Sequence, residues 1–328
     1  MGLRRKRRLF GAGLGAGLLG AVFLALRFAV RPVTKARVPD TISPAIFRTK
    51  ALHTSLGQVV YHESGSGPTL VFIHGVCPGA SSYEWSKVYP QFTASHRVLA
   101  PDLIGFGESA RPDASLTASD YAKALAEFIR GTCDQPVSIV ASGLGGGFSV
   151  LLASQHPEVV RQLFLWMPTG FAENRAREVS LGRRVASMAP VLHRFMYRNY
   201  ESSRAAVRGW LAIHGFADGS RITEETVEVY ATCAQQYGAE HAIRNLYLGR
   251  LNVDLDQRLP MLSQPVTLLW PGQPAEAPSE APARLQALAR GSRLLLVPRL
   301  SQLAAVEGPS EIAALLAEEL DPGPKVVR

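Results

Sequence analysis

Cysteine is scarce in this sequence: among 328 residues, only Cys77, Cys133 and Cys233 are cysteines. An odd number of widely spaced cysteines excludes a disulfide framework and a cysteine-based metal motif. Carboxylates are missing from the start of the chain, where residues 1–37 carry nine lysines and arginines. Because the whole chain has a net charge of +8, subtracting these nine charges leaves −1 for the rest. The near-neutral body argues against nucleic acid as a partner.

The basic N-terminus surrounds a long apolar run. Residues 9–26, LFGAGLGAGLLGAVFLAL, are eighteen uncharged positions behind a basic cluster. A helix of that length spans roughly 27 Å, close to the hydrocarbon core of a bilayer. We expect residues 1–30 to be a single-pass membrane anchor and residues 31–47 a linker; a cleaved export or transit peptide and a buried soluble helix are the alternatives. Basic residues flank the run on both sides, so the sequence does not indicate which side of the membrane holds the domain. It does not indicate the oligomeric state either.

After the linker, short apolar runs alternate with amphipathic stretches, which is typical of a mainly parallel sheet flanked by helices. Buried strands are predicted at 70–74, 98–102, 137–141, 162–166, 266–270 and 293–297, and helices at 118–131, 145–155 and 309–320. The β pattern is missing from 171–255, where helical spacing indicates a cap over the strand ends, at which such sheets bind ligands. The expected fold class is α/β, with its core at 48–170 and 256–322.

Four local motifs occur in order along the core. His74-Gly75-Val76 follows one buried strand, and DLIGFGES (102–109) follows the next. A glycine-rich turn, ASGLGGG (141–147), joins strand to helix, and the helical insert follows the strand after it. Together these motifs resemble the α/β-hydrolase family over residues 50–320, especially the branch with epoxide hydrolases, haloalkane dehalogenases and small esterases. The resemblance implies the α/β-hydrolase fold, with helices on both faces of the sheet and a helical cap insert.

The resemblance also implies a nucleophile at the strand-to-helix turn, a histidine that takes its proton or activates water, and an acid that orients the histidine. The turn needs small residues two positions before and after the nucleophile. Gly143 meets this condition because Ala141 and Gly145 flank it, whereas a corner at Ser142 would put bulkier residues there. The nucleophile position therefore falls on Gly143, which has no side chain.

The histidine position of the family is also substituted. It lies in the turn before the C-terminal helix, where Glu307-Gly308-Pro309 sets the alignment and Gln302 takes the place of histidine. No histidine follows His241 in the sequence. Glutamine cannot shuttle a proton near neutral pH, so the role of general base is vacant.

The acid position of the family falls on Ala275. Glu276 could serve if the loop shifts by one residue, and the family's other acid position offers only Glu173. Removing nucleophile and base from a working triad costs about 10⁶-fold in rate. We therefore expect no catalytic residue at the three triad positions, Gly143, Ala275 and Gln302.

Ligand-binding groups are still expected around the turn. The backbone N–H groups of Val76 and Leu144 match the oxyanion donors of the family and depend on no side chain. His74 and Gly75 belong to the same loop, and His74 is expected to support it rather than to catalyse. Asp102 is expected to stabilise the turn after its strand.

Two fallback nucleophiles and three fallback bases are left open. Ser142 adjoins the corner, and Cys77 adjoins the oxyanion loop but has no basic partner nearby in sequence. His193, His214 and His241 lie in the insert and could reach the site. No sequence motif indicates a metal or an organic cofactor, and we expect neither.

These features favour a membrane-anchored hydrolase-like protein that binds a small apolar or lipid-like ligand without triad catalysis. A second hypothesis is an active hydrolase of an ester, epoxide or related apolar substrate that uses a non-standard nucleophile or activated water. A third is a membrane scaffold whose anchor or cap makes protein contacts.

Overall fold

The computed structural model describes residues 42–169, 179–272 and 280–320. The predicted anchor at 1–30 and most of the predicted linker lie outside these ranges. Among the helices described, none is both long and apolar enough to cross a membrane. The last part of the predicted linker packs against the core, because Ile42 and Phe47 are both buried. The folded domain therefore begins before the predicted boundary at residue 48.

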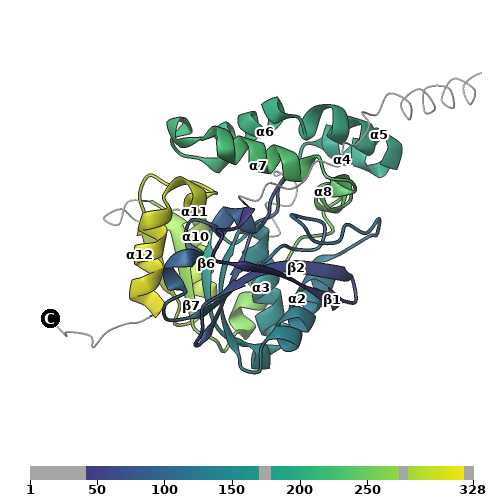
Figure 1. The fold of residues 1–328 in the computed structure, drawn as a ribbon. Coiled ribbons are helices and arrows are strands. Elements are labelled where there is room, and N and C mark those ends of the chain that lie inside the picture. The colour runs from purple at the N-terminus through teal and green to yellow at the C-terminus, as the bar shows by residue number, and fades with distance from the viewer. Residues whose placement is uncertain (1–41, 170–178, 273–279, 321–328) are drawn as a thin grey trace, which may run out of the picture.

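An eight-stranded sheet lies at the centre of the described chain, in the order β1-β2-β4-β3-β5-β6-β7-β8 (Figure 1). Its strands are β1 (Arg48–Thr54), β2 (Gly57–Ser64), β3 (Thr69–Ile73), β4 (Arg97–Pro101), β5 (Val137–Ser142), β6 (Val160–Trp166), β7 (Val266–Pro271) and β8 (Arg293–Val297). β2 is antiparallel to β1 and β4, and the pairs from β4 to β8 are parallel. The sequence does not predict the hairpin β1–β2, because β1 is largely exposed and has no apolar run.

Alternate residues of each buried strand face opposite sides of the sheet. In β3, Val71 and Ile73 belong to one apolar cluster, whereas Leu70 and Phe72 belong to another. The first cluster includes residues of α2 (Ala118–Thr132), α3 (Gly143–Gln155), α9 (Leu255–Arg258) and α10 (Glu280–Leu288). The second includes residues of α11 (Ala304–Glu307), α12 (Pro309–Leu320) and the 3₁₀ turns Ser82–Trp85 and Tyr89–Phe92. The predicted sheet with helices on both faces is confirmed.

The described part of the cap is helical, as its sequence pattern predicts. It contains α4 (Leu181–Met188), α5 (Pro190–Met196), α6 (Arg204–Trp210), α7 (Glu224–Ala234) and α8 (Ala239–Tyr247). π-helical turns extend α5 and α6 at Tyr197–Glu201 and Leu211–Gly215. Figure 1 shows these helices as a layer on one side of the α/β core.

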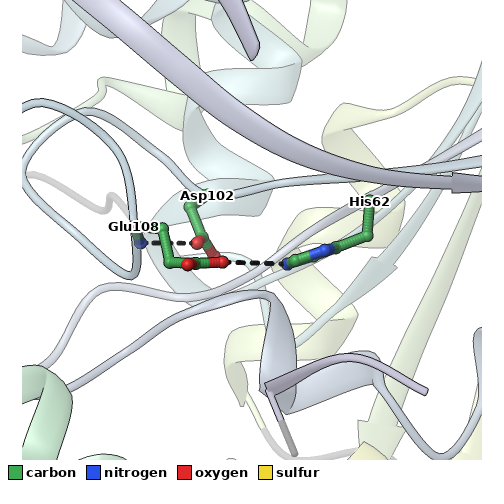
Figure 2. Close-up of side chains that lie close together, drawn as sticks. All are labelled: His62, Asp102 and Glu108. Atoms are coloured by element: carbon green, nitrogen blue, oxygen red, sulfur yellow. Dashed lines mark hydrogen bonds and ion pairs between the residues drawn. The ribbon is translucent and has the colours of Figure 1, made fainter. Parts of the chain in front are cut away.

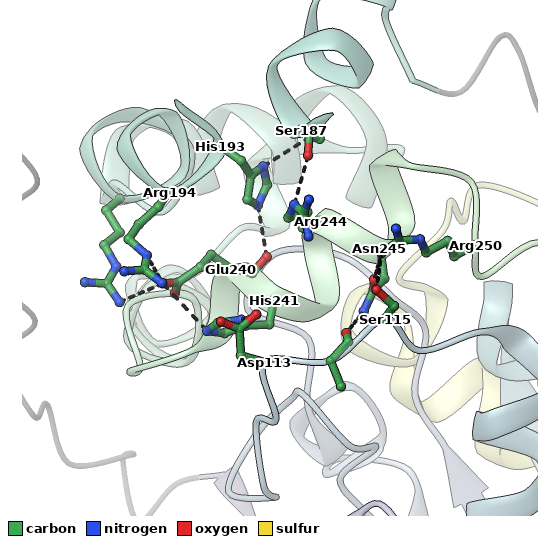
Figure 3. Close-up of polar contacts among 12 residues, drawn as sticks. Asp113, Ser115, Ser187, His193, Arg194, Glu240, His241, Arg244, Asn245 and Arg250 are labelled. Atoms are coloured by element: carbon green, nitrogen blue, oxygen red, sulfur yellow. Dashed lines mark hydrogen bonds and ion pairs between the residues drawn. The ribbon is translucent and has the colours of Figure 1, made fainter. Parts of the chain in front are cut away.

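Polar contacts attach cap helix α8 to the core loop that follows β4 (Figure 3). His241 Nδ1 lies 2.8 Å from Asp113 Oδ1, and the side-chain amide of Asn245 donates to the carbonyl oxygen of Ala114 at 2.8 Å. The tight packing at Gly105, where an added Cβ would lie 2.5 Å from Ala242 Cβ, brings the same helix onto the loop. The cap is therefore fixed to the core at this end.

We predict that Gly145→Ala lowers the free energy of unfolding by about 1–3 kcal/mol, because overpacking forces the backbone apart. An added Cβ at Gly145 would lie 2.2 Å from the carbonyl oxygen of His74. Gly209→Ala in α6 is the matched control, since no atom lies within 4 Å of its added Cβ and alanine favours a helix. Urea unfolding of both variants measures the difference. Equal stability of the two variants would contradict the close approach of α3 to the His74 loop.

Candidate functional site

The candidate site lies where the chain changes direction across the sheet. β4 is added on one side of β3 and β5 on the other, and such switch points leave a crevice at the carboxyl ends of the strands. The loop after β3 carries His74 and Gly75, and the turn after β5 carries Ser142 and Gly143. The two segments touch, because an added Cβ at Gly75 would lie 3.3 Å from Ser142 Oγ.

The turn between β5 and α3 has its corner at Gly143, whose φ of +49° is a left-handed conformation. An added Cβ at Gly143 would meet only Gly75 Cα, at 3.9 Å. The corner thus has room for a side chain, and the backbone holds the strained shape that would expose one. The structure puts Gly143 at the corner and Ser142 at the end of the strand, buried and facing elsewhere.

A buried glutamate lies behind this turn and interacts with both segments. Glu84, 2% exposed, accepts a hydrogen bond from the backbone N–H of Gly75 at 2.8 Å. Its other carboxylate oxygen accepts one from the hydroxyl of Ser142. Ser142 is the N-cap residue of α3 but makes no capping hydrogen bond, because its hydroxyl points to Glu84 instead.

The sequence analysis does not identify Glu84, although the sequence carries a signal. Glu84 is the only carboxylate between Glu63 and Asp102, and it lies between Tyr83 and Trp85. Burial raises the pKa of Glu84 to about 7, while the hydrogen bonds from Ser142 and Gly75 act to lower it. The site therefore contains a carboxyl group that titrates near neutral pH.

His74 and Cys77 have surroundings that suit structural roles. His74 is fully buried; its Nε2 accepts the backbone N–H of Leu103 at 3.0 Å, so its Nδ1 carries the proton that is donated to the carbonyl of Gly75 at 2.6 Å. Burial lowers the pKa of His74, which keeps the ring neutral. Burial, with the charge of Glu84, raises the pKa of the Cys77 thiol well above its usual value. A thiol of this kind is a poor nucleophile.

The two expected oxyanion donors lie on the segments that meet at the corner. Leu144 is in the first turn of α3, whose N–H groups have no acceptor within the helix. Val76 follows Gly75 in the loop after β3 and is half-buried. The aligned peptide dipoles of α3 add partial positive charge at this end of the helix. The arrangement can stabilise a carbonyl oxygen or another hydrogen-bond acceptor without any side chain.

The loop at the family's histidine position contacts the cap. Gln302 is exposed there, while Ser301 Oγ donates to the carbonyl of His214 at 3.1 Å. The backbone N–H of Leu303 donates to the carbonyl of Gly215 at 2.9 Å. This loop thus attaches the end of the second π-helical turn to the core.

Glu307 strengthens the same attachment from a buried position. Its Oε1 accepts the backbone N–H groups of Ala217 and Asp218 at 2.9 and 2.8 Å, and its Oε2 accepts that of Ser301 at 3.0 Å. Glu307, which sets the sequence alignment in this region, therefore joins the cap at 217–218 to the loop at 301.

Two of the fallback histidines are engaged within the cap or at its base. His193 is buried, with Nδ1 at 3.1 Å from Ser187 Oγ and Nε2 at 2.9 Å from the carbonyl oxygen of Glu240 (Figure 3). His241 pairs with Asp113. The acid candidates Ala275, Glu276 and Glu173 lie outside the described residues.

Three side chains near the turn after β4 could supply metal ligands. Ligand atoms of His62, Asp102 and Glu108 lie within 4.8 Å of one another (Figure 2). Both oxygens of Asp102 already accept backbone N–H groups, from Ser82 at 2.6 Å and from Glu108 at 2.7 Å. Asp102 thereby closes the turn, as the sequence predicts for it. The expectation that the protein uses no metal stays a prediction.

Comparison with known proteins agrees with this geometry. The sequence model for the alpha/beta hydrolase fold matches residues 68–207. This region of the chain therefore belongs to the α/β-hydrolase superfamily. The region outside the match still carries β7, β8 and α12, which complete the sheet and its second face.

Among the curated α/β-hydrolase relatives is the 2-hydroxymuconate semialdehyde hydrolase of Pseudomonas sp. (strain CF600), 37% identical over 111 residues. That match covers 33% of this chain and 39% of the relative. A haloalkane dehalogenase of Mesorhizobium japonicum (strain LMG 29417 / CECT 9101 / MAFF 303099) is 32% identical over 130 residues, which is 39% of this chain and 40% of the relative. The chain therefore matches about two fifths of the length of these relatives.

Solved structures share the fold at low sequence identity. A serine hydrolase involved in carbazole degradation superimposes with a TM-score of 0.70 at 21% identity, covering 84% of this chain and all of that one. A bacterial membrane phospholipase A superimposes with a TM-score of 0.69 at 23% identity, covering 97% of this chain and 98% of that one. At these identities the likeness establishes the α/β-hydrolase fold alone.

We predict that Glu84→Gln becomes more stable relative to the wild type as the pH rises from 5 to 8. When folding raises the pKa of a carboxyl group, that group stabilises the native state at pH values below its pKa in the unfolded chain. This stabilisation is lost as the pH rises through the pKa in the folded protein, which is about 7 for Glu84. The variant should therefore gain at most about 3 kcal/mol in free energy of unfolding relative to the wild type. Urea unfolding at both pH values measures it.

Glu158→Gln is the control, because Glu158 is exposed and its pKa is lowered by a hydrogen bond from Arg130. This variant should show no such relative gain between pH 5 and 8. A pH-independent difference between Glu84→Gln and the wild type would contradict the raised pKa of Glu84.

Proposed function

We propose that this chain is a membrane-anchored α/β-hydrolase-like protein that binds a small apolar or lipid-like ligand and lacks triad catalysis. The observation that carries the proposal is the Gly143 corner, where the strained turn is retained, a side chain would fit, and none is present. In hydrolases, the strand-to-helix turn exposes a nucleophile at that point. Without a nucleophile, the turn can still bind a ligand.

The surroundings of the corner support binding over chemistry. His74 has both ring nitrogens engaged by the backbone, and Gln302 at the histidine position cannot act as a base near neutral pH. The side chains of Val76 and Leu144 are apolar, while their N–H groups suit a ligand oxygen. An apolar ligand with one polar oxygen fits both properties.

Attachment to a membrane rests on the sequence of residues 9–26 and the basic residues around it. The proposal assigns to this segment the role of a single-pass anchor, which would hold the ligand site near a lipid surface. Small apolar ligands partition into that surface, so an anchored binder would meet them at raised concentration.

An active hydrolase is the second candidate, and one contact favours it. The hydroxyl of Ser142 donates to Glu84, whose pKa of about 7 would allow it to accept a proton. Serine beside a base is the arrangement of an activated nucleophile. Against it, Ser142 is only 3% exposed and does not occupy the corner of the turn.

We predict that the full-length protein in detergent neither reacts with a fluorophosphonate probe nor turns over short esters and epoxides. The same preparation should gain thermal stability with medium-chain alcohols or amides, because a ligand that binds only the native state raises Tm. A commercial esterase in the same detergent is the positive control for the probe. Turnover that is lost in both Ser142→Ala and Glu84→Gln would instead establish the second candidate.

A further inference from the structure

The first turn of α3 is a positive helix end that already has an anion beside it. The carboxylate of Glu84 accepts the hydroxyl of Ser142, the N-cap residue, and the backbone N–H of Gly75. A helix end carries only about half a positive charge. A second anion bound at the corner would therefore share this partial positive charge of the helix end with the carboxylate of Glu84.

Glu84 is close enough to the corner for its charge to act there. An added Cβ at Gly143 would lie 3.9 Å from Gly75 Cα, and an added Cβ at Gly75 would lie 3.5 Å from Glu84 Oε2. With one bond of about 1.5 Å between these two contacts, the carboxylate is at most about 9 Å from the corner. At an effective dielectric of about 20, repulsion over that distance weakens binding of an anion by about tenfold or more.

No cation of the described cap compensates this charge. Its arginines, apart from the exposed Arg184, bond to carboxylates or to other oxygens of the cap and of neighbouring core segments: Arg183, Arg194, Arg198, Arg204, Arg208, Arg221, Arg244 and Arg250. In the core, the half-buried Arg111 donates to the carbonyls of Gly107 and Ser109 in its own loop. The hydrogen bonds that lower the pKa of Glu84 come from the hydroxyl of Ser142 and the backbone N–H of Gly75, not from a cation.

The cap contributes a neutral hydrogen-bonding group that interacts electrostatically with Glu84. Tyr230 of α7 is fully buried, and its hydroxyl has no hydrogen-bond partner in the described part of the chain. Burial raises the pKa of Tyr230, with a further contribution from the charge of Glu84, so the phenol keeps its proton. Cys77 also interacts electrostatically with Glu84, and the raised pKa of its thiol keeps it protonated. An unpaired buried hydroxyl can donate to a ligand oxygen such as that of an alcohol or amide, and the discrimination against an anionic head comes from the charge of Glu84.

We propose that the buried Glu84 side chain makes this site select ligands with a neutral polar head, an alcohol or a primary amide on an alkyl chain, over alkyl carboxylates. This selection rests on the proposed binding function and names its ligand class. Glu84 acts here through charge at a distance and through the segments it holds. It is a specificity-determining residue that need not touch the ligand.

The selection should depend on pH in a defined direction. As the pH falls through about 7, Glu84 takes up a proton and its repulsion of an anionic head is lost. An alkyl carboxylate is still ionised at pH 6, so its binding should improve there. Binding of a neutral ligand has no such cause to change.

The test compares 1-octanol, octanamide and octanoate, which share one chain length, as ligands of the full-length protein by calorimetric titration at pH 8 and pH 6. At pH 8 we expect the amide and the alcohol to bind at least about tenfold more tightly than octanoate. The ratio should fall several-fold at pH 6. In Glu84→Gln it should be within about twofold of unity at both pH values, whereas Glu158→Gln, which removes an exposed charge, should behave as the wild type.

Each outcome decides a different point. Neutral ligands and octanoate binding equally to the wild type at pH 8 would overturn the charge selection while leaving the binding function intact. Binding of none of the three would overturn both proposals. If Glu84→Gln does not fold, the wild-type ratio decides alone, and a ratio unchanged between pH 8 and pH 6 would overturn the role of Glu84.

Discussion

The close approach of helix α3 to the loop after β3 is the constraint on which the candidate site depends. Gly145 lies so near the carbonyl of His74 that any side chain would collide with it, and this contact sets where α3 begins. The turn at Gly143 must then reverse direction within one residue, which requires its left-handed backbone. The shape of the corner follows from packing in the core and does not depend on what the corner carries.

Glu84 connects this shape to the electrostatics of the site. Its carboxylate holds the loop through Gly75 and the strand end through Ser142, so one buried group joins both sides of the crevice. A buried carboxyl without a cation is costly when ionised, which is why its pKa moves toward neutrality. The same group thus stabilises the arrangement and determines which ligand charges the arrangement tolerates.

The cap is attached at two places that lie apart in the sequence. α8 contacts the loop after β4 through Asp113 and Ala114, and Glu307 holds the chain at 217–218 beside the loop at 301. The second attachment uses the loop that carries the general base in the family. Gln302, the residue that the sequence analysis expects at that position, is exposed in this loop.

Local sequence determined the strands β3–β8, the helical character of the cap, the strand-to-helix turn and the identity of the residue at its corner. These features depend on apolar periodicity and on glycine at short range, which one chain segment carries by itself. The sequence also predicts the structural roles of His74 and Asp102 from their positions after strands. The hairpin β1–β2 and the packing of Ile42 and Phe47 are not predicted, because β1 is largely exposed without an apolar run and the segment at 42–47 has no periodicity.

Only the tertiary structure decided the partner of Ser142, the position of Glu84 and the attachment of the Gln302 loop to the cap. Glu84 and Ser142 lie far apart in the sequence, and their contact exists because β3 and β5 are neighbours in the sheet. From the sequence alone, a single glutamate among aromatic residues would be taken for an exposed charge. Its burial, and with it its raised pKa, arises when the loop after β3, the turn after β5 and the cap come together around it. No local sequence pattern encodes this packing.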